Sequence, residues 1–199
     1  MEEIKLLSSD DVIEQIKDFP RWYYLSDEQK LLIDKLMPDK ELKKCYKENG
    51  LCEECKQPKT DYDWCQSCNA KRFQQNFKNW SSRNDDVDKF IQKAQLNAKN
   101  NKEVLEWIEH DRFENIEYLA KGGFGTVFKA IWKDGPIDEW DSENNQYKRW
   151  GDIQVALKCL YNSHDTMAEF LGEVSYSFIV LTLIMNDKLT IAHHHYISG

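Results

Sequence analysis

Two closely spaced pairs of cysteines constrain this chain more than any other feature of its sequence. The first pair is Cys52 and Cys55, and after nine further residues comes the second pair, Cys65 and Cys68. Each C-x2-C turn brings two thiolates together, and two facing turns supply the four soft ligands of a tetrahedral Zn²⁺ ion. We therefore expect a structural zinc site. Because the protein would fill all four positions, the metal would have no open position for catalysis.

Two other interpretations of these cysteines stay open. Either pair alone has the form of a redox motif, and the four thiols could also be unliganded surface groups. Cys45 lies seven residues before Cys52, outside the rhythm of the pairs, and we expect it to be an ordinary buried thiol. The N-terminus lacks the basic and apolar regions of a signal peptide, so we expect reduced thiols in an intracellular, cytoplasmic protein.

The net charge and the hydropathy of the chain argue against nucleic acid and membranes as partners. The 199 residues include 27 Lys and Arg against 35 Asp and Glu, which gives a net charge of -8. This acidic balance does not favour general binding to nucleic acid. The longest apolar run, Phe178 to Met185, has eight residues and is too short to span a bilayer. We therefore expect no membrane partner.

A short basic and aromatic stretch follows the second cysteine pair. Lys71 and Arg72 precede Phe73, Phe77 and Trp80. Zinc knuckles sometimes contact RNA phosphates and bases with such residues. We favour the alternative in which the three aromatic residues form the apolar side of a helix that packs on the zinc loop. On this interpretation, binding of nucleic acid is not expected.

The first 44 residues predict a helical N-terminal segment. One helical pattern ends at Pro20, because proline cannot continue a helix. Ser26 and Gln29 have the spacing of a capping box and predict a second helix from residue 28 to Met37.

Two further segments precede the β-rich part of the chain. Residues 45–83 make up a zinc-knuckle-like module that contains the four paired cysteines. Residues 84–109 predict a connecting helix that Asn84 can cap, with an interruption at the Asn-rich residues 97–102 before Val104 resumes the apolar pattern.

The pattern changes to β-strands beyond residue 111. Two β-rich runs end near residues 119 and 132 and flank a glycine-rich turn, and a polar, Trp-containing stretch over residues 134–151 predicts a loop. Residues 153–160 alternate between apolar and polar side chains, as a strand with one buried face does. Thr166 and Glu169 then predict a capped helix.

Three elements of this region could act together on a phosphate. Gly122, Gly123 and Gly125 lie between two strands and let the backbone approach a phosphate closely. A strand follows them rather than a helix, which argues against a Walker loop or a Rossmann fingerprint. Lys158 lies on a later strand, and Glu173 lies fifteen residues further along, within the predicted helix. A cation held by a helix carboxylate can coordinate nucleotide phosphates.

Taken together, these motifs resemble the N-terminal lobe of a eukaryotic protein kinase over residues 113–174. The matching motifs are the glycine-rich loop at residues 120–127, the third-strand lysine motif at residues 155–158 and the C-helix at residues 169–174. More narrowly, the chain is similar to the tyrosine-kinase-like family expanded in mycorrhizal fungi, in which a cysteine knuckle precedes the kinase domain. The residues that carry this narrower similarity are 64–80, 113–135 and 155–163.

The resemblance implies that the chain binds ATP. The glycine-rich loop would cover the phosphates, while Lys158 would contact the α- and β-phosphates and pair with Glu173. Val127 and Ala156 would flank the adenine. Ala120 stands where the first glycine of the loop usually lies. The residues implied to bind the nucleotide are Ala120, Gly122, Gly123, Phe124, Gly125, Val127, Ala156 and Lys158, and the implied catalytic pair is Lys158 and Glu173.

Other parts of a kinase domain are not found in the sequence. No Asp-Phe-Gly or Ala-Pro-Glu motif occurs after the glycine loop, and residues 110–112 scramble the His-Arg-Asp order. Only 25 residues follow Val174, whereas a C-lobe needs roughly 150. We therefore expect a truncated or mispredicted gene product in which residues 175–199 are a divergent tail. The three adjacent histidines from His193 would point to different sides, so we expect no metal site there.

The expected fold is α+β, with an antiparallel sheet and a C-helix preceded by short helices and the cysteine module. Two classes of function fit this fold. The first is an ATP-binding chain of the protein kinase family, by resemblance a Ser/Thr/Tyr phosphotransferase that would use Mg²⁺ in a complete domain and act on a protein substrate. The second is a zinc-stabilised protein-interaction module or a pseudokinase adaptor without catalysis.

Overall fold

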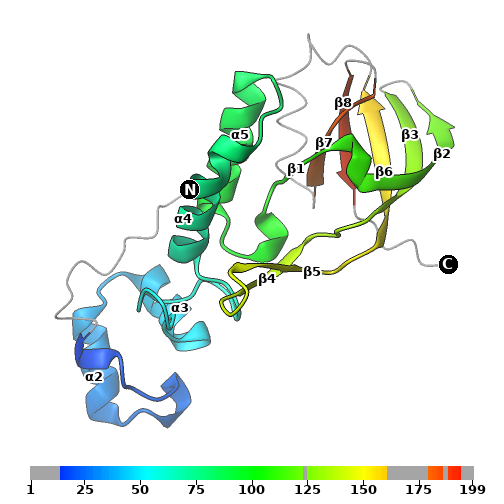
Figure 1. Ribbon diagram of the computed structural model, residues 1–199. Coiled ribbons are helices and arrows are strands. Elements are labelled where there is room, and N and C mark those ends of the chain that lie inside the picture. The colour runs from blue at the N-terminus through cyan, green and yellow to red at the C-terminus, as the bar shows by residue number, and fades with distance from the viewer. Residues whose placement is uncertain (1–13, 123–124, 161–178, 186–187, 194–199) are drawn as a thin grey trace.

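The computed structural model describes the backbone of residues 14–122, 125–160, 179–185 and 188–193, and the side chains of 14–122 and 125–159. The fold is α+β, with several helices and antiparallel sheets, as the sequence predicts. Figure 1 shows the helical N-terminal part at one end, the curved sheet at the other, and helices α4 and α5 between them.

Residues 14–16 are helical, as the pattern that ends at Pro20 predicts, and two further helices and a 3-10 turn follow them in the N-terminal part. These are η1 (Trp22–Tyr24), α2 (Asp27–Leu36) and α3 (Lys40–Asn49). The predicted capping box is confirmed, because the Ser26 hydroxyl accepts from the Gln29 backbone N–H at 3.2 Å and Gln29 Oε1 accepts from the Ser26 N–H at 2.9 Å. The two helices bury Ile33 and Tyr46 in a core that also includes Ile16. Helix α3 was not predicted, and it crosses the expected boundary at residue 44.

The middle of the chain contains α4 (Gln66–Asn76), η2 (Phe77–Asn79), α5 (Asp85–Asn97) and η3 (Asn101–Glu103). As predicted, the Asn84 side chain caps α5 by accepting from the N–H groups of Asp86 and Val87. The expected continuation of this helix beyond the Asn-rich interruption is wrong. The chain instead becomes extended, and the Gln95 side chain donates to the backbone oxygen of Leu105 at 2.7 Å.

The main sheet has six strands in the order β1-β7-β8-β6-β3-β2. The strands are β1 (Trp107–Ile108), β2 (Phe113–Lys121), β3 (Gly125–Trp132), β6 (Ile153–Leu160), β7 (Ile179–Met185) and β8 (Lys188–His193), and η4 (His110–Arg112) leads into β2. All neighbours pair antiparallel except β1 and β7, which are parallel. Strands β7 and β8 extend this sheet beyond the boundary at residue 174 that the resemblance implied.

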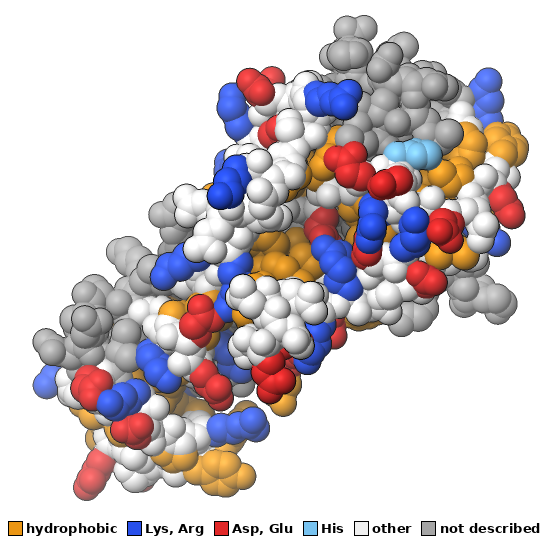
Figure 2. Space-filling view, in the orientation of Figure 1, with side chains coloured by type: hydrophobic (Ala, Val, Ile, Leu, Met, Phe, Trp, Pro, Cys, Tyr) orange, Lys and Arg blue, Asp and Glu red, His pale blue; other side chains and the backbone are white. Residues whose placement is uncertain are grey.

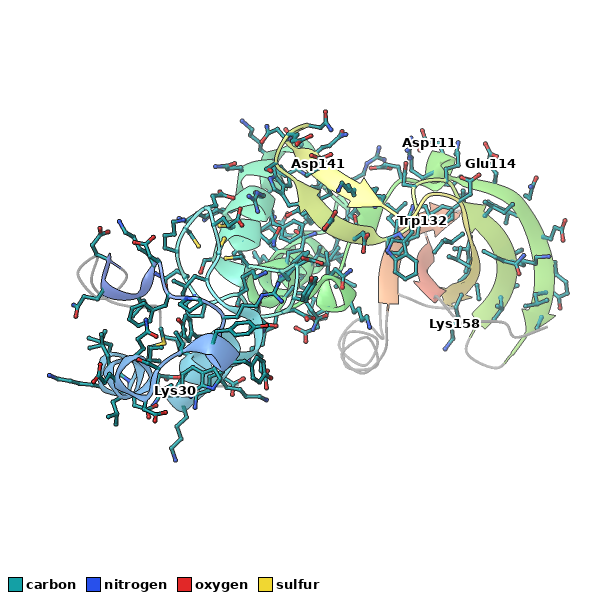
Figure 3. The ribbon with its side chains drawn as sticks, turned by 90° about the horizontal axis from the view of Figure 1, so that it is seen from below. Lys30, Asp111, Glu114, Trp132, Asp141 and Lys158 are labelled. Atoms are coloured by element: carbon teal, nitrogen blue, oxygen red, sulfur yellow. The ribbon has the colours of Figure 1, made fainter. Side chains whose placement is uncertain are left out.

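The alternation predicted for residues 153–160 is confirmed along the described side chains of β6. Val155, Leu157 and Cys159 are buried, whereas Gln154 is exposed. The buried side packs against Trp132, which is 1% exposed and lies on the concave side of the sheet (Figure 3). One face of the sheet therefore belongs to the core, and Ala156 and Lys158 lie on the other face.

Residues 134–151 differ from the predicted loop, because they contain a second sheet. Strands β4 (Ile137–Asp141) and β5 (Gln146–Arg149) pair as an antiparallel hairpin. At its tip the Asp141 carboxylate accepts from the backbone N–H groups of Glu143 and Asn144. Figure 1 shows that this hairpin reaches from the main sheet toward α4. The aromatic residues of the hairpin, Trp140 and Tyr147, pack against α4. The polar composition of residues 134–151 gives no sign of these contacts.

Candidate functional site

The four predicted cysteine ligands lie together. Their Sγ atoms are all within 4.8 Å of one another, with Cys52 and Cys68 3.8 Å apart and Cys55 and Cys65 3.4 Å apart. A tetrahedron with Zn–S distances of about 2.3 Å has S···S edges of about 3.8 Å, so the cluster has the size that zinc requires. All four thiols are free rather than disulfide-bonded. The cluster could therefore hold a metal ion such as zinc.

The backbone places the two pairs in different ways. The first pair lies on a tight turn in which the Lys56 N–H donates to the Cys52 oxygen at 2.9 Å and Lys56 adopts the left-handed φ of 58°. The second pair begins α4, with Cys65 at the N-cap and Cys68 in the first turn. The positive end of a helix dipole stabilises a thiolate, so this position favours metal binding.

The electrostatics of the cluster also favour a cation. Hydrogen bonds from the thiols of Cys55 and Cys65 lower the pKa of the Cys52 thiol, while the contact with Cys52 raises the pKa of the Cys65 thiol. Burial raises the pKa of the Cys68 thiol. Neighbouring thiols therefore cannot all ionise by themselves. A divalent cation at their centre would allow four thiolates, because each would then face a positive charge.

Cys45 behaves as predicted. It lies in α3, is 7% exposed and free, and burial raises the pKa of its thiol. Cys159 is also buried, in the sheet core. Neither residue belongs to the cluster of four.

A buried amide connects the cluster to the β4–β5 hairpin. Asn69 is 3% exposed and donates through Nδ2 to the backbone oxygen of Cys65 at 3.0 Å. The Tyr147 hydroxyl, from β5, donates to Asn69 Oδ1 at 2.9 Å. Burial raises the pKa of Tyr147 well above its usual range, so the hydroxyl keeps the proton that it donates. Nothing in the local sequence predicts this contact, because 78 positions separate the two residues.

Aromatic rings extend this connection. The Tyr147 ring stacks on Phe73 with centroids 5.3 Å apart and an interplanar angle of 15°, and on Trp64 at 6.5 Å and 20°. Trp64 donates through Nε1 to the Ala98 oxygen at 2.9 Å. The expectation that Phe73 packs on the cysteine module is thus confirmed, and Phe77 is partly buried against the same cluster. The expectation that all three aromatic residues share one helix is wrong, because α4 ends at Asn76 and both Phe77 and Trp80 lie beyond it. Trp80 makes an edge contact with Phe77 at 6.4 Å.

The glycine-rich turn and Lys158 lie close together in the sheet. Ala120 pairs with Val127 across β2 and β3, and Val127 pairs with Lys158 across β3 and β6. These three residues form one row across three neighbouring strands, and Ala156 lies on the same face two positions before Lys158 in β6. Figure 3 shows Lys158 at the end of the sheet opposite to Asp111 and Glu114.

The turn itself closes just beyond this row. The Gly122 N–H donates to the Gly125 oxygen at 2.9 Å. A Cβ at position 122 would meet only that oxygen, at an ordinary 3.9 Å, so the turn does not itself require glycine there. Gly123, Phe124 and Glu173 lie outside the described residues, as does the predicted helix that begins near residue 166.

A cleft of about 1130 Å³ lies beside the cysteine module. One wall comes from α4 and η2, and the other from the β4–β5 hairpin. In Figure 2, hydrophobic side chains form a floor between these parts of the surface, with charged groups beside it. The cleft was not predicted, and none of the described residues predicted to bind nucleotide lines it.

Two ion pairs support the walls of this cleft. Arg72 pairs with Glu54 and lies 4.1 Å from the centroid of the Trp140 ring. Arg149 pairs with Glu106 and donates to the Gly135 oxygen at 2.7 Å. Burial raises the pKa of the Glu106 carboxyl, although Arg149 acts in the opposite direction.

Comparisons with known proteins complete the description of the site. No known family model matches this chain, and no curated protein matches it significantly. The resemblance to protein kinases therefore stays a prediction based on the residues quoted above. Within the described residues, the structure has no helix with the length and apolar character needed to cross a membrane.

Proposed function

We propose that the main sheet binds ATP in the manner of a protein kinase N-lobe. The observation that carries this proposal is the row formed by Ala120, Val127 and Lys158 immediately beside the glycine-rich turn. Lys158 would contact the phosphates, the backbone of the turn would cover them, and Val127 and Ala156 would contact the base. A side chain would fit at position 122 without a clash inside the protein. This supports the proposal, because a glycine there would instead allow a phosphate to approach the backbone closely.

The catalytic part of the proposal extends to Glu173, which would pair with Lys158 and hold its ammonium toward the phosphates. Phosphate transfer to a Ser, Thr or Tyr side chain would further require the acid and Mg²⁺-binding residues of a complete kinase domain. ATP binding is therefore the activity proposed for this chain, and transfer is proposed only for a complete domain.

Calorimetric titration of the chain with ATP and Mg²⁺ tests this function. Lys158→Ala should weaken binding by about tenfold or more, because a hydrogen bond from a charged donor contributes about 1.5–3 kcal/mol. Lys148→Ala is the matched control, since Lys148 is exposed on β5 and pairs with Glu139 instead. Equal affinities for the wild type and Lys158→Ala, or no ATP binding by the wild type, would overturn the proposal.

We further propose that the cysteine cluster binds zinc and that the metal stabilises a protein-interaction module. The cleft favours this second function, because the cysteine module forms part of its lining through Glu54 and Cys68. Zinc supplies folding free energy to segments that are too small to have a core of their own. Metal content, measured by atomic emission on the purified chain, should give one zinc per chain. A metal-free chain with an unchanged cleft would refute this function.

A further inference from the structure

The cleft beside the cysteine module has the features of a built binding site. Gln95 and Glu106 line it and are 6% and 8% exposed. Gln95 Nε2 is fixed by its bond to the Leu105 oxygen, whereas Gln95 Oε1 has no hydrogen-bond partner among the described residues. The lining therefore includes two nearly buried polar side chains, of which Glu106 pairs with Arg149.

The size and lining of the cleft indicate what kind of ligand fits. Its volume of about 1130 Å³ exceeds the roughly 300–1,000 Å³ of small-molecule sites. Trp107 of β1, Trp140 of β4 and Trp80, which directly follows η2, provide aromatic surface. Side-chain amides, such as that of Gln75, can both donate to and accept from a peptide backbone. Aromatic surface combined with amides suits an extended chain segment with at least one apolar side chain.

The charges of the lining distinguish a peptide from a nucleic acid. Three basic residues line the cleft and three acidic residues oppose them. The basic residues are Lys71, Arg72 and Arg149, and the acidic residues are Glu53, Glu54 and Glu106. Two of the three cations are already neutralised in ion pairs. A single-stranded nucleic acid needs an excess of positive charge along its backbone, which this lining does not offer.

We propose that this cleft binds an extended peptide segment of low net charge, which places an apolar side chain against the tryptophans. This inference rests on the interaction function proposed above and is independent of ATP binding. The metal would act through the first cysteine turn, because Glu54 on that turn pairs with Arg72 and Arg72 in turn lies against Trp140.

Selection from a phage-displayed library of random 12-residue peptides tests this proposal on the zinc-loaded chain. We expect enrichment of peptides that share an apolar residue in a weakly charged context. Binding of a synthesised consensus peptide should then weaken by about tenfold or more in Trp80→Ala, as for other tryptophan hot spots. The matched control is Trp150→Ala, which removes a tryptophan that is 52% exposed and outside the cleft.

A second cleft variant is needed in case Trp80→Ala does not fold. Gln75 lies on the exposed face of α4, and Gln75→Arg should block the cleft without disturbing the helix, because arginine is a good helix former. Zinc content and circular dichroism confirm that each variant folds. Equal peptide binding by the wild type and both cleft variants would overturn the proposal, as would the absence of any enriched peptide from a zinc-loaded chain.

Further measurements distinguish the peptide proposal from nucleic-acid binding, from ATP binding and from a zinc-dependent module. Tighter binding of a 12-residue oligouridylate than of the peptide would assign the cleft to nucleic acid and refute the peptide proposal. Saturating ATP should leave peptide binding unchanged, so a failure of the ATP proposal does not affect this result. A chain that binds peptide equally well with and without zinc would retain the peptide site and contradict only the metal-dependent module.

Discussion

Replacing Tyr147 with Phe removes one hydroxyl group and tests whether the β4–β5 hairpin stabilises the cysteine module. The ring would keep its stacking on Phe73 and Trp64, so the variant isolates the hydrogen bond to Asn69 Oδ1. Asn69 is 3% exposed, and its oxygen would stay buried without this donor. A buried polar atom left unpaired costs about 1–3 kcal/mol, and we expect Tyr147→Phe to lower the free energy of unfolding by that amount.

Urea denaturation of the zinc-loaded chain measures this loss, followed by tryptophan fluorescence, because Trp64 lies in the same cluster. For a chain of this size, each kcal/mol should lower the Tm by about 2–4 °C. Zinc transfer to a chelator should also be faster in the variant, since Asn69 holds the Cys65 oxygen beside a metal ligand.

Tyr62→Phe is the matched control. Tyr62 lies between the two cysteine pairs but is 64% exposed, and surface substitutions usually change stability by less than about 0.5 kcal/mol. If Tyr147→Phe and Tyr62→Phe differ by less than this amount, and zinc leaves both at the same rate, the hairpin does not support the module and the reasoning is wrong.

Three other predictions test the metal site, a helix start and a buried carboxyl. Cys52→Ser should lower the zinc content, measured by atomic emission, well below one per chain. Cys45→Ser should retain the metal, because Cys52 belongs to the cluster of four and Cys45 does not. Ser26→Ala should cost about 1 kcal/mol in the urea unfolding of the N-terminal part, since it removes the cap of α2, and an unchanged midpoint would contradict the capping role. Burial raises the pKa of Glu106, so the folded chain holds this proton more tightly than the unfolded chain does. The stability that this proton confers is complete below the ordinary Glu pKa and is lost as pH rises through the raised pKa. Glu106→Gln can still accept from Arg149 and should flatten this fall in urea midpoints as the pH rises above the ordinary Glu pKa. Parallel pH profiles of the wild type and the variant would count against this prediction.

Features set by short sequence spacing could be predicted well. The Ser26–Gln29 capping box and the Asn84 cap each depend on residues two or three positions apart. The buried and exposed alternation of β6 depends on a period of two. Each of these patterns acts within one element, so the sequence contains all the information that the local geometry needs.

The predicted loop at residues 134–151 was wrong because its strands are stabilised from outside. Trp140 stacks against Arg72, and Tyr147 packs on Phe73, both of which belong to α4. A polar hairpin with little apolar periodicity depends on such distant partners to order it. Nothing within those eighteen positions identifies the helix that receives them.

The sequence by itself determined the ligands of the candidate metal centre, because two C-x2-C turns of the right spacing already hold four thiols in two pairs. It also determined that a glycine turn would lie between strands and that Lys158 would share a strand face with Ala156. The tertiary structure decided which strands become neighbours, and so brought Ala120, Val127 and Lys158 into one row. It also decided that a hairpin from the sheet would close one wall of a cleft beside the cysteines. Apart from the pairing of Ala120 with Val127, these contacts join residues tens of positions apart, and their free energy comes from burying surfaces that meet only when the whole chain has folded.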